Sequence, residues 1–443
     1  MQKGLREFID LLGKNDELLR VSEPVNPLDI AMNLSGSDKA VLMDVKGYDI
    51  PVVGGIMKGR EKIALALGCE PNEITEKISW ALDHPLDTVM VKEAPCQEIV
   101  ITGDDVDLTM FPIDFQHEKD GAPYIGSAVQ MASWGKWGPN AGMYRHMFRT
   151  KNTMGIDLYT PNDMRLYYSQ ANEEGKPLEV AAAIGLYPTE LIAASYSAPT
   201  DVNEMTIAGA LRGEPLEMAH CKTIDVEVPA NAEIVLECEI LPDGWCADEG
   251  RYGEFHNITG GMKTNPIVKV KAITHRKNPI YYSLHMPNEV HSLNAALLET
   301  QAYRLLKSAR MRPTAVRAPQ GSSAYFELVV ALDHPRPGEG KTALLALMSI
   351  LGVKFVTVVD EDIDIFNDED LRWALSLRVQ PDKDVLIVSN VQAKHIDPSV
   401  CAHLLPPGRL PVTSKMGIDG TIPPDINRSA YERIVMFRAD GKY

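Results

Sequence analysis

Acidic side chains, an arginine and two glycines are concentrated in DEGRYGEFHN, residues 248–257. Glu249 and Glu254 are five residues apart, which separates them by about 140° on a helix and puts them on opposite faces of a strand. A turn could direct both carboxylates to one point, and Gly250 and Gly253 offer the backbone freedom that a turn requires. Two carboxylates held close together titrate as a coupled pair, which suits a site that handles protons.

A second stretch, GPNAGMYRHMFRT at residues 138–150, sets Asn140 and Arg145 among apolar and aromatic side chains. A buried arginine needs a partner, and its planar guanidinium pairs best with a carboxylate through two parallel hydrogen bonds. Taken alone, the stretch favours a structural Arg–Glu pair over a functional one.

Two further charges stand in unusual surroundings, Glu204 in DVNEMTIAGALRGEP and Lys415 in TSKMGIDGTIPP. Taken singly, each is typical of a surface charge. The histidines and cysteines lack zinc-like spacing, whereas the amide, carboxylate and hydroxyl groups near these motifs suit Mg²⁺ or Mn²⁺ holding a phosphate. GEGKTA resembles a nucleoside triphosphate loop, but Pro335 occupies the position of its first glycine, so a helix start is the better interpretation.

The composition is ordinary for a soluble globular protein. With 44 basic and 61 acidic residues among 443, the formal charge of −17 argues against nucleic acid or an anionic membrane as a partner and fits a cytoplasmic protein. The first residues predict an amphipathic surface helix, not a signal peptide, and apolar runs stay short of the roughly 20 residues of a membrane span. The six dispersed cysteines indicate buried, reduced thiols.

These groups must be positioned by a mixed α/β (α+β) chain. Residues 1–110 predict an N-terminal α/β unit, with AVLMDV and PVVGGI as strands and EKIALAL as a helix. Residues 111–287 contain many short strands (SAVQMASW, NAEIVLECEIL, PIVKVKAITH and PIYYSLHM), a spacing typical of a barrel or sandwich. LEVAAAIGLYPTELIAAS adds an apolar strand and a helix inside this unit.

The last third of the chain changes pattern again. Residues 288–312 predict one long connecting helix, and residues 313–443 form a third unit. There FELVVAL, KFVTVVD and DVLIVSN alternate with helical segments, which indicates a parallel sheet. From about residue 405 the chain is rich in Pro and Gly, and we expect it to run over the surface or onto a neighbour.

In this order the four motifs resemble the UbiD family of decarboxylases, which use prenylated FMN. Asn140-Ala-Gly-Met-Tyr-Arg145 resembles the family's asparagine-to-arginine segment, and Glu204 lies where a metal-binding glutamate precedes Gly-x-Leu-x-Gly. Glu249 to Glu254 resembles the paired-glutamate turn, and Lys415-Met-Gly-Ile-Asp-Gly-Thr the C-terminal lysine motif. The resemblance covers essentially the whole chain. It implies a central split β-barrel that binds the flavin and a C-terminal α/β oligomerisation domain.

One departure from the family pattern concerns a metal ligand. Members typically carry a Gln-His pair 17 and 18 residues beyond the arginine, and here those positions are Asn162 and Asp163. An aspartate binds a hard divalent ion at least as well as imidazole, so Asp163 can conserve the metal site, although a shifted register is the alternative.

The resemblance implies a reversible, non-oxidative decarboxylase of an aromatic, heteroaromatic or α,β-unsaturated carboxylic acid. Substrate joins prenylated FMN covalently, CO₂ leaves into the electron sink of the cofactor, and protonation follows. In this scheme Glu254 delivers the proton, while Arg145 holds Glu249 ionised and steers the substrate carboxylate. These three residues are the catalytic candidates.

The cofactor set follows from the same resemblance. Asn140, Asp163 and Glu204 are the candidate ligands of a divalent metal, Mn²⁺ or Mg²⁺, and backbone oxygens of residues 194–197 match a potassium-binding segment. Expected flavin contacts are Asn140, Met143, Arg145, Asn162, Ser195, Glu204 and Lys415. A flavin prenyltransferase would supply the cofactor, and a homo-oligomer, dimer or hexamer, is expected.

Two competing functions are a non-catalytic flavin-binding or assembly protein and a flavin-dependent oxidoreductase. The first has no use for three proton-handling groups, and the second does not need a paired-acid turn. The substrate is not readable from the motifs, although His285, Met286 and His291 are candidates for facing it. His256 could order Glu254 or serve only the fold.

Overall fold

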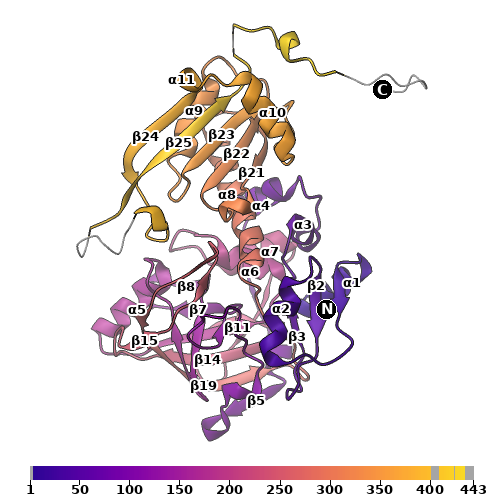
Figure 1. Ribbon diagram of the computed structural model, residues 1–443. Coiled ribbons are helices and arrows are strands. Elements are labelled where there is room, and N and C mark those ends of the chain that lie inside the picture. Colours follow the sequence, from indigo (N-terminus) through magenta and orange to yellow (C-terminus); the bar gives the residue numbers. More distant parts are fainter. Residues whose placement is uncertain (1–2, 401–408, 424, 435–443) are drawn as a thin grey trace. The chain divides into compact units, whose positions relative to one another are not determined.

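The computed structural model describes residues 3–400, 409–423 and 425–434, and the chain divides into two compact units, Met1–Leu297 and Leu298–Tyr443. The long helix expected near residues 288–312 is present as α8 (Asn288–Ser308) and belongs partly to each unit (Figure 1).

The first unit begins with a small sheet and its helices. As the apolar spacing predicts, α1 (Leu5–Lys14) buries Leu5, Phe8, Ile9 and Leu12. The sheet runs in the order β1 (Leu18–Arg20), β2 (Ala40–Met43), β3 (Val52–Gly54) and β20 (Tyr281–Tyr282). The nearby helices are α2 (Ile30–Ser35), α3 (Arg60–Leu67) and α4 (Ile74–Asp83). The strand from PIYYSLHM, expected in the central barrel, therefore pairs with β3 instead.

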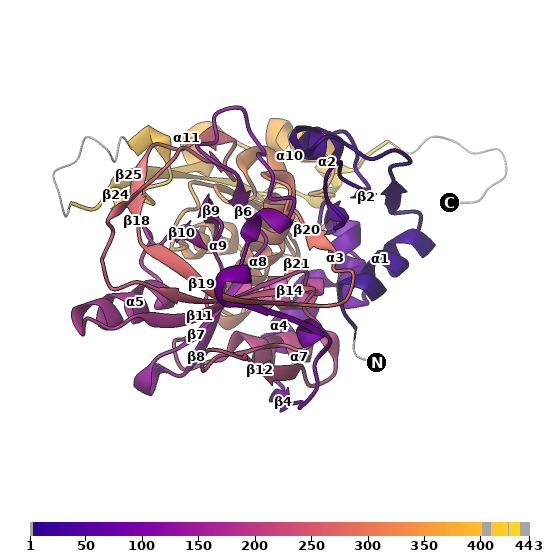
Figure 2. The same ribbon diagram turned by 90° about the horizontal axis from the view of Figure 1, so that it is seen from below.

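The central sheet of the first unit is open and curled, in agreement with the expected split barrel (Figure 2). Its strands, in spatial order, are β6 (Tyr124–Ile125), β9 (His146–Thr150), β10 (Thr153–Ile156), β19 (Ile267–His275), β14 (Ile234–Ile240), β11 (Leu178–Ile184), β7 (Val129–Ser133) and β8 (Pro139–Met143). β5 (Ile99–Thr102) also pairs with β19. It contacts the end of β19 that follows the residues paired with β10. Thus a strand from the first 110 residues joins the central sheet.

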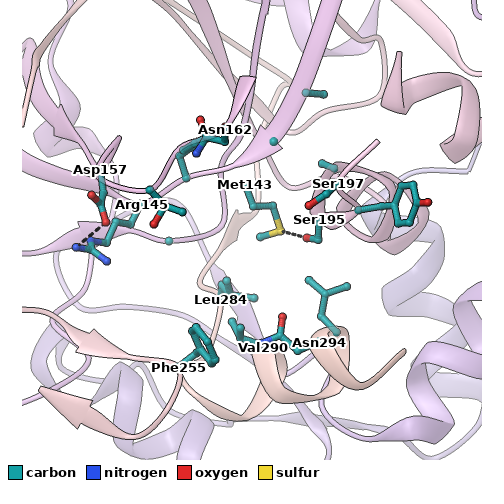
Figure 3. Close-up of a pocket in the computed structure, with 18 of the residues that line it drawn as sticks. Met143, Arg145, Asp157, Asn162, Ser195, Ser197, Phe255, Leu284, Val290 and Asn294 are labelled. Atoms are coloured by element: carbon teal, nitrogen blue, oxygen red, sulfur yellow. Dashed lines mark hydrogen bonds and ion pairs between the residues drawn. The ribbon is translucent and has the colours of Figure 1, made fainter. Parts of the chain in front are cut away.

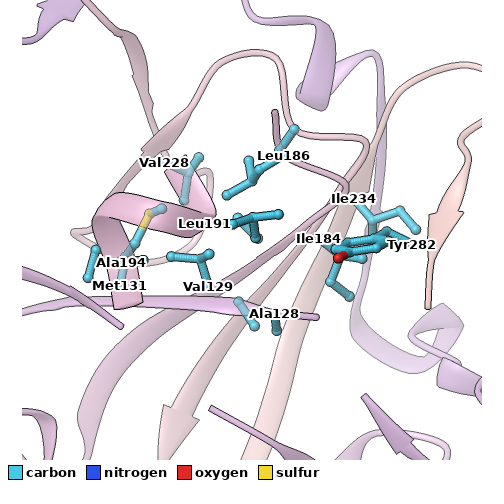
Figure 4. Close-up of a cluster of buried hydrophobic side chains, with 14 of the residues drawn as sticks. Ala128, Val129, Met131, Ile184, Leu186, Leu191, Ala194, Val228, Ile234 and Tyr282 are labelled. Atoms are coloured by element: carbon cyan, nitrogen blue, oxygen red, sulfur yellow. The ribbon is translucent and has the colours of Figure 1, made fainter. Parts of the chain in front are cut away.

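Apolar side chains fill the space between the central sheet and a buried helix. The helices of this part are α5 (Asp163–Glu173), α6 (Pro188–Ser195) and α7 (Glu204–Arg212). Figure 4 shows Leu191 and Ala194 of α6 against Val129 and Met131 of β7, and all four are at most 6% exposed. Burying such side chains stabilises the fold by about 1.5–3 kcal/mol for each large one, so this core fixes α6 on the sheet.

Short strands complete the first unit. β12 (Glu217–His220) lies between β13 (Glu227–Pro229) and β4 (Val89–Met90). The motif DEGRYGEFHN contributes β15 (Ala247–Glu249) and β16 (Gly253–Glu254), which pair with β18 (Lys263–Asn265) and β17 (Ile258–Thr259), respectively. The two glutamates therefore sit on separate short strands joined by a bend.

The second unit is built on a mixed sheet. Its order is β21 (Pro313–Arg317), β22 (Glu327–Leu332), β23 (Phe355–Asp360), β25 (Val412–Gly420) and β24 (Val385–Gln392), with helices α9 (Glu339–Leu347), α10 (Asp368–Arg378) and α11 (Pro381–Asp384). β22, β23 and β25 run parallel, whereas β24 is antiparallel to β25. DVLIVSN, which belongs to β24, was expected to be a parallel neighbour in this sheet. The later strand β25 lies between β23 and β24 instead.

β25 corrects the expectation that the chain beyond about residue 405 covers the surface. Gly417 and Gly420 lie on opposite faces of this strand and allow close packing on both sides. A Cβ on Gly417 would lie 2.5 Å from Met348 Cε, which follows α9, and one on Gly420 would lie 3.3 Å from Leu375 Cδ2 of α10. The glycines that suggest a loop are instead the residues that let helices approach the sheet.

The described cysteines match the expectation of buried thiols only in part. Cys69, Cys96, Cys221, Cys238 and Cys246 are free thiols, and Cys401 lies outside the described residues. Cys96 and Cys238 are buried, Cys69 and Cys221 are half-buried and Cys246 is exposed, so the expectation of buried thiols holds for two of these five. Within the described ranges, no helix combines the length and the apolar character needed to cross a membrane.

Candidate active site

A cavity of about 580 Å³ opens in the first unit beside the bend of the acidic motif. Its lining comes from β8, the starts of α5, α7 and α8, the end of α6 and residues 252–255. In Figure 3, Phe255, Leu284, Val290 and Asn294 form one wall, facing Met143 and Asn162 across the space. The volume is within the range of small-molecule and cofactor sites, about 300–1,000 Å³.

Arg145 joins both glutamates of the acidic motif. Its Nε donates to Glu249 Oε1 at 2.8 Å and its Nη2 to Glu249 Oε2 at 3.2 Å, which is the two-bonded pairing expected of a guanidinium. Its Nη1 donates to Glu254 Oε1 and Oε2 at 3.1 and 3.2 Å. The structure therefore brings together the three residues that the sequence picks out as catalytic candidates.

The two glutamates differ in their access to the cavity. Glu254 lines the cavity and its side chain is 14% exposed, whereas the Glu249 side chain is 1% exposed and is held by two separate nitrogens of Arg145. Glu254 accepts from only one nitrogen of Arg145, Nη1, and at longer distances. Glu249 is thus the fixed partner, and Glu254 is the one that can exchange its contact for a group in the cavity.

The surroundings of Arg145 keep it charged. Its Cζ lies 4.7 Å from the ring centroid of Tyr252, a cation–π contact with a buried aromatic ring. Burial works against the charged form, but Glu254, Asp157 and Glu249 more than offset it and raise the pKa of the guanidinium. Arg145 is therefore a permanent positive charge at the cavity.

Asp157 and Lys263 belong to the same cluster and were missed by the sequence motifs. Asp157 Oδ2 lies 2.8 Å from Arg145 Nη2, and Figure 3 shows this ion pair. Lys263 Nζ lies 3.5 Å from Asp157 Oδ2 and 3.7 Å from Glu254 Oε1. Asp157 belongs to no motif, and the pairing of β15 with β18 is what places Lys263 opposite Glu249.

The glycines of the bend serve close packing and not the turn geometry that the sequence suggested, because neither Gly250 nor Gly253 has a positive φ. A Cβ on Gly250 would lie 2.6 Å from Gly121 Cα, and one on Gly253 would lie 2.0 Å from His117 Nδ1. Main-chain and side-chain bonds from residues 120–124 then hold the bend. They are Gly121 N to Arg251 O (2.8 Å), Gly253 N to Asp120 Oδ1 (2.9 Å) and Tyr124 OH to Gly250 O (3.0 Å).

A second polar cluster lies at the starts of α5 and α7. Glu204, 2% exposed, accepts hydrogen bonds from Ala141 N at 2.8 Å and Asn140 Nδ2 at 3.1 Å. Asp163 accepts from Thr200 Oγ1 at 2.9 Å, and Asn140, Asp163 and Glu204 all line the cavity. Asn140 Oδ1 is buried without a hydrogen-bond partner among the described residues.

The charge balance of this cluster favours a cation. Burial raises the pKa of Glu204 to about 7, the Ala141 N–H partly opposes this, and the negative charge of Asp163 adds to it. A buried amide oxygen without a donor and two nearby carboxylates make an all-oxygen set, the chemistry that Mg²⁺ and Mn²⁺ prefer. The donor set therefore fits a hard divalent ion.

The other expected flavin contacts in the first unit also reach the cavity. Met143, Asn162 and Ser195 are lining residues, and Ser195 Oγ donates to Leu191 O at 2.8 Å and lies 3.1 Å from Met143 Sδ (Figure 3). Asn162 caps α5 by accepting from Arg165 N. Residues 194–197, the expected potassium segment, line the cavity as well.

Lys415 belongs to the second unit and has its own partners there. Its Nζ donates to Met348 O and Ile350 O, both at 2.7 Å, and burial lowers the pKa of its ammonium. Met286 lines the cavity, whereas His285 faces a neighbouring one and His291 contacts Phe255 O through Nε2. The His256 ring packs edge-on against Phe255.

Comparison with known families gives matches to consecutive parts of the chain. The models described as the N-terminal, Rift-related and C-terminal domains of 3-octaprenyl-4-hydroxybenzoate carboxy-lyase match residues 9–82, 88–288 and 291–420. Together they span nearly the whole sequence.

Individual relatives match over nearly their full length. Anhydromevalonate phosphate decarboxylase of Methanothermobacter thermautotrophicus is 31% identical, over 95% of this chain and 97% of the relative. The UbiD-class enzyme HmfF from Pelotomaculum thermopropionicum in complex with FMN has a TM-score of 0.92 and 33% identity, with 100% and 99% of the two chains covered. An evolved dimeric form of HmfF in complex with prFMN has a TM-score of 0.89 and 32% identity, with the same coverage.

Proposed function

The chain belongs to the UbiD family and is a carboxy-lyase, and from this premise we propose that it catalyses the reversible, non-oxidative decarboxylation of an unsaturated carboxylic acid with prenylated FMN as cofactor. HmfF, its structural relative, is known in complex with FMN and with prFMN. Losing CO₂ from an sp² carbon leaves an unstabilised electron pair, which the protein side chains alone cannot accommodate.

One observation carries this proposal. A single guanidinium, Arg145, is hydrogen-bonded to both Glu249 and Glu254 at the edge of a cavity of about 580 Å³. A protein that only bound a flavin would gain nothing from two buried acids sharing one cation, because burying charges costs free energy unless function requires them.

The cofactor would be held by residues from several elements. Asn140, Asp163 and Glu204 would bind a divalent ion, Mn²⁺ or Mg²⁺, that ties the flavin phosphate to the protein, and backbone oxygens of residues 194–197 would hold K⁺. When bound, prenylated FMN supplies an electrophilic centre that accepts the electron pair released with CO₂. Lys415 stays a prediction, since it belongs to the second unit.

Substrate orientation and proton delivery are the roles of protein side chains. Arg145 orients the substrate carboxylate, and because its donors already face protein carboxylates, the substrate must replace one of them. Glu254 is the acid with the weaker, single-nitrogen hold, so it is the group that leaves Arg145 and delivers a proton to the carbon that lost CO₂. Glu249 stays with Arg145 and fixes its orientation.

The substrate is proposed at the level of a class. Aromatic, heteroaromatic and α,β-unsaturated acids all fit the chemistry, and the curated decarboxylase relative acts on an anhydromevalonate phosphate. The chain itself would work as a homo-oligomer, dimer or hexamer, in the cytoplasm, with cofactor delivered by a flavin prenyltransferase.

The cofactor is tested by co-expressing the chain with a flavin prenyltransferase and measuring the mass and absorbance of the bound flavin. We expect a flavin heavier than FMN by a five-carbon group, exchange of labelled CO₂ into an unsaturated acid, and deuterium from D₂O in its decarboxylated product at the carbon that lost CO₂. Unmodified FMN together with NAD(P)H turnover would favour an oxidoreductase. Tightly bound prenylated flavin without any exchange across an acid panel would favour an assembly protein.

The role of Glu254 is tested by Glu254→Gln, which keeps the shape of the side chain but cannot deliver the proton. We expect CO₂ release to fall by about 10²-fold or more while the flavin stays bound. Near-wild-type release would remove Glu254 from the acid role. Glu23→Gln, the same change at an exposed position outside the cavity, serves as the control.

A further inference from the structure

A second cavity of about 660 Å³ lies beside the candidate active site, also within the first unit. Its walls come from Leu28 and α2, from residues 115–118, from Asn257 and from residues 285–288. Leu28 and Met32 at this cavity are 68% and 72% exposed. Large apolar side chains left open at a concave site are typical of a surface that binds a ligand.

The two cavities are neighbours that share one lining residue, Met286. Along the chain, Leu284 lines the first cavity, His285 lines the second, and Met286 lines both. The segment after the acidic motif repeats this arrangement, with Phe255 at the first cavity and Asn257 at the second. Met286 is unbranched and flexible, so it can be moved by a molecule that extends from one cavity to the other.

His285 places two ring nitrogens without hydrogen-bond partners among the described residues at the second cavity. The residue is 5% exposed, and among the described residues neither ring nitrogen has a hydrogen-bond partner. Leaving a buried donor and acceptor unpaired costs stability, so such groups are normally satisfied by a ligand or water. Its backbone is fixed, because His285 N donates to Glu289 Oε2 at 2.7 Å.

Gln116 fixes the rest of this wall. Its amide donates to Leu284 O at 2.7 Å and accepts from Met286 N at 2.8 Å, which anchors the residues on both sides of His285. The imidazole is therefore presented to the cavity on a rigid segment, and a ligand would not have to order it.

The imidazole is neutral at physiological pH. Burial, with the positive charges of Lys58 and His117, lowers the pKa of His285 to about 4. A neutral imidazole has one N–H donor and one acceptor nitrogen. A single hydroxyl complements it, since a hydroxyl both donates and accepts.

The charges around the cavity do not favour an anion. His117 faces Asp120, with its Nδ1 at 3.5 Å from Oδ2, and Glu118 adds a carboxylate to the lining. Lys58 donates to Ser37 O at 2.6 Å and lies 3.5 Å from Asp38. Lys58 and His117, the two cations that act on His285, thus already have acidic or carbonyl partners, and among the described residues they leave no free positive charge for a phosphate or carboxylate.

We propose that the second cavity binds the far end of the substrate, and that this end carries a hydroxyl group on an apolar chain or ring. The reacting carboxylate would lie by Arg145 in the first cavity, the substrate would pass Met286, and the hydroxyl would meet His285. This assignment rests on the proposed function and narrows the substrate to hydroxylated unsaturated acids.

The test uses a homologous series of trans-α,β-unsaturated acids that end in a hydroxyl, a methyl or a phosphate group. Dissociation constants are measured by calorimetry on the flavin-loaded and the flavin-free full chain. At the chain length that spans both cavities, we expect the hydroxyl acid to bind about tenfold or more tightly than the methyl acid. Equal affinities at every length would mean that water satisfies His285 and would overturn the proposal, as would tightest binding of the phosphate.

Substitutions distinguish an effect on ligand binding in the second cavity from an effect on the fold. His285→Leu should abolish the preference for hydroxyl over methyl, and His285→Gln, which keeps a donor and an acceptor, should retain part of it. His220→Leu, the same change at an exposed position, should leave it intact. Met286→Trp should weaken long acids more than short ones, and equal weakening of both would contradict a ligand that spans both cavities.

The two proposals fail differently. CO₂ release from short acids without any hydroxyl preference would support the decarboxylase and refute the role of the second cavity. A hydroxyl preference without CO₂ release from any acid would leave the cavity assigned and refute the proposed reaction.

Discussion

At the scale of residues, Arg145 is surrounded by more carboxylates than the family motifs imply. Glu249, Glu254 and Asp157 all contact its guanidinium, and Lys263 lies within 3.7 Å of two of these acids. Asp157 Oδ2 lies 2.8 Å from Nη2, the nitrogen that also donates to Glu249 Oε2. Asp157 is thus placed to tune how tightly Arg145 holds Glu254.

Asp157→Asn removes one negative charge from this cluster. Glu254 then has one competitor fewer for Arg145 and is held more strongly, so its release from Arg145 to the substrate becomes harder. We expect the rate of CO₂ release to fall across the pH–rate profile, with flavin content unchanged. Asp248→Asn, an exposed acid on β15, is the control, and an unchanged profile in Asp157→Asn would contradict the tuning role.

Asp163 gives a second test at this scale. Removing one of two carboxylates from an all-oxygen site should weaken Mn²⁺ binding, so Asp163→Ala should raise the Mn²⁺ dissociation constant by about tenfold or more. Electron paramagnetic resonance of free Mn²⁺ measures this without any turnover. Asp201→Ala removes an exposed acid nearby and should have no effect. Equal affinities in both variants would show that Asp163 is not a ligand.

The sequence identified most of these groups because their types are unusual in their settings. An arginine among apolar residues and two acids around glycines predict each other as partners, and the structure joins them. Asp157 and Lys263 could not be found this way, since a single acid before a loop and a lysine on a short strand are ordinary. Their importance comes from the pairing of strands far apart in the sequence.

At the scale of elements, the bend between β15 and β16 depends on close approach of two backbones. Gly250 faces Gly121, so a methyl group at either position meets main chain that cannot move aside. We expect Gly250→Ala to destabilise the first unit by about 1–3 kcal/mol, the usual cost of overpacking, and to reduce activity further by shifting Glu254.

Thermal unfolding and CO₂ release measure the two effects. Gly261→Ala is a matched control in the same region, because a Cβ there meets nothing within 4 Å and its φ is not positive. A Gly250→Ala variant as stable and active as Gly261→Ala would contradict the packing argument.

Periodicity predicted the elements whose apolar pattern is local, such as α1 and α8. Periodicity did not predict which strands pair with each other. Tyr281 and Tyr282 have a strand pattern that suits any sheet, and only the tertiary structure sends them to β3. In the sequence, the glycines of β25 suggest a loop and not a strand. Glycine is favoured both where elements pack closely and where the backbone is flexible, so the sequence does not distinguish the two.

At the scale of the whole molecule, buried histidines make the stability depend on pH. Burial lowers the pKa of His146 to about 4 from an ordinary 6.5, so the unfolded chain binds a proton more readily than the folded one between these values. The stability is therefore complete above about pH 6.5 and is lost as the pH falls towards 4, by about 3 kcal/mol for a shift of this size.

His146→Leu removes the titrating group from a site that is 0% exposed. We expect its melting temperature to fall less than that of the wild type between pH 7 and pH 4.5, measured by calorimetry at matched ionic strength. His220→Leu, at an exposed site, should follow the wild-type curve. Parallel curves for all three proteins would contradict a depressed pKa at His146.

The order of the second sheet has a consequence for biosynthesis. β24 pairs with β25, yet β25 is made later by the ribosome than every other strand of that sheet. At about 5–20 residues per second, β24 must wait for its neighbour with its hydrogen-bonding groups open. An unpaired strand edge invites contact with other nascent chains, so this unit should depend on chaperones at high expression more than the first unit does.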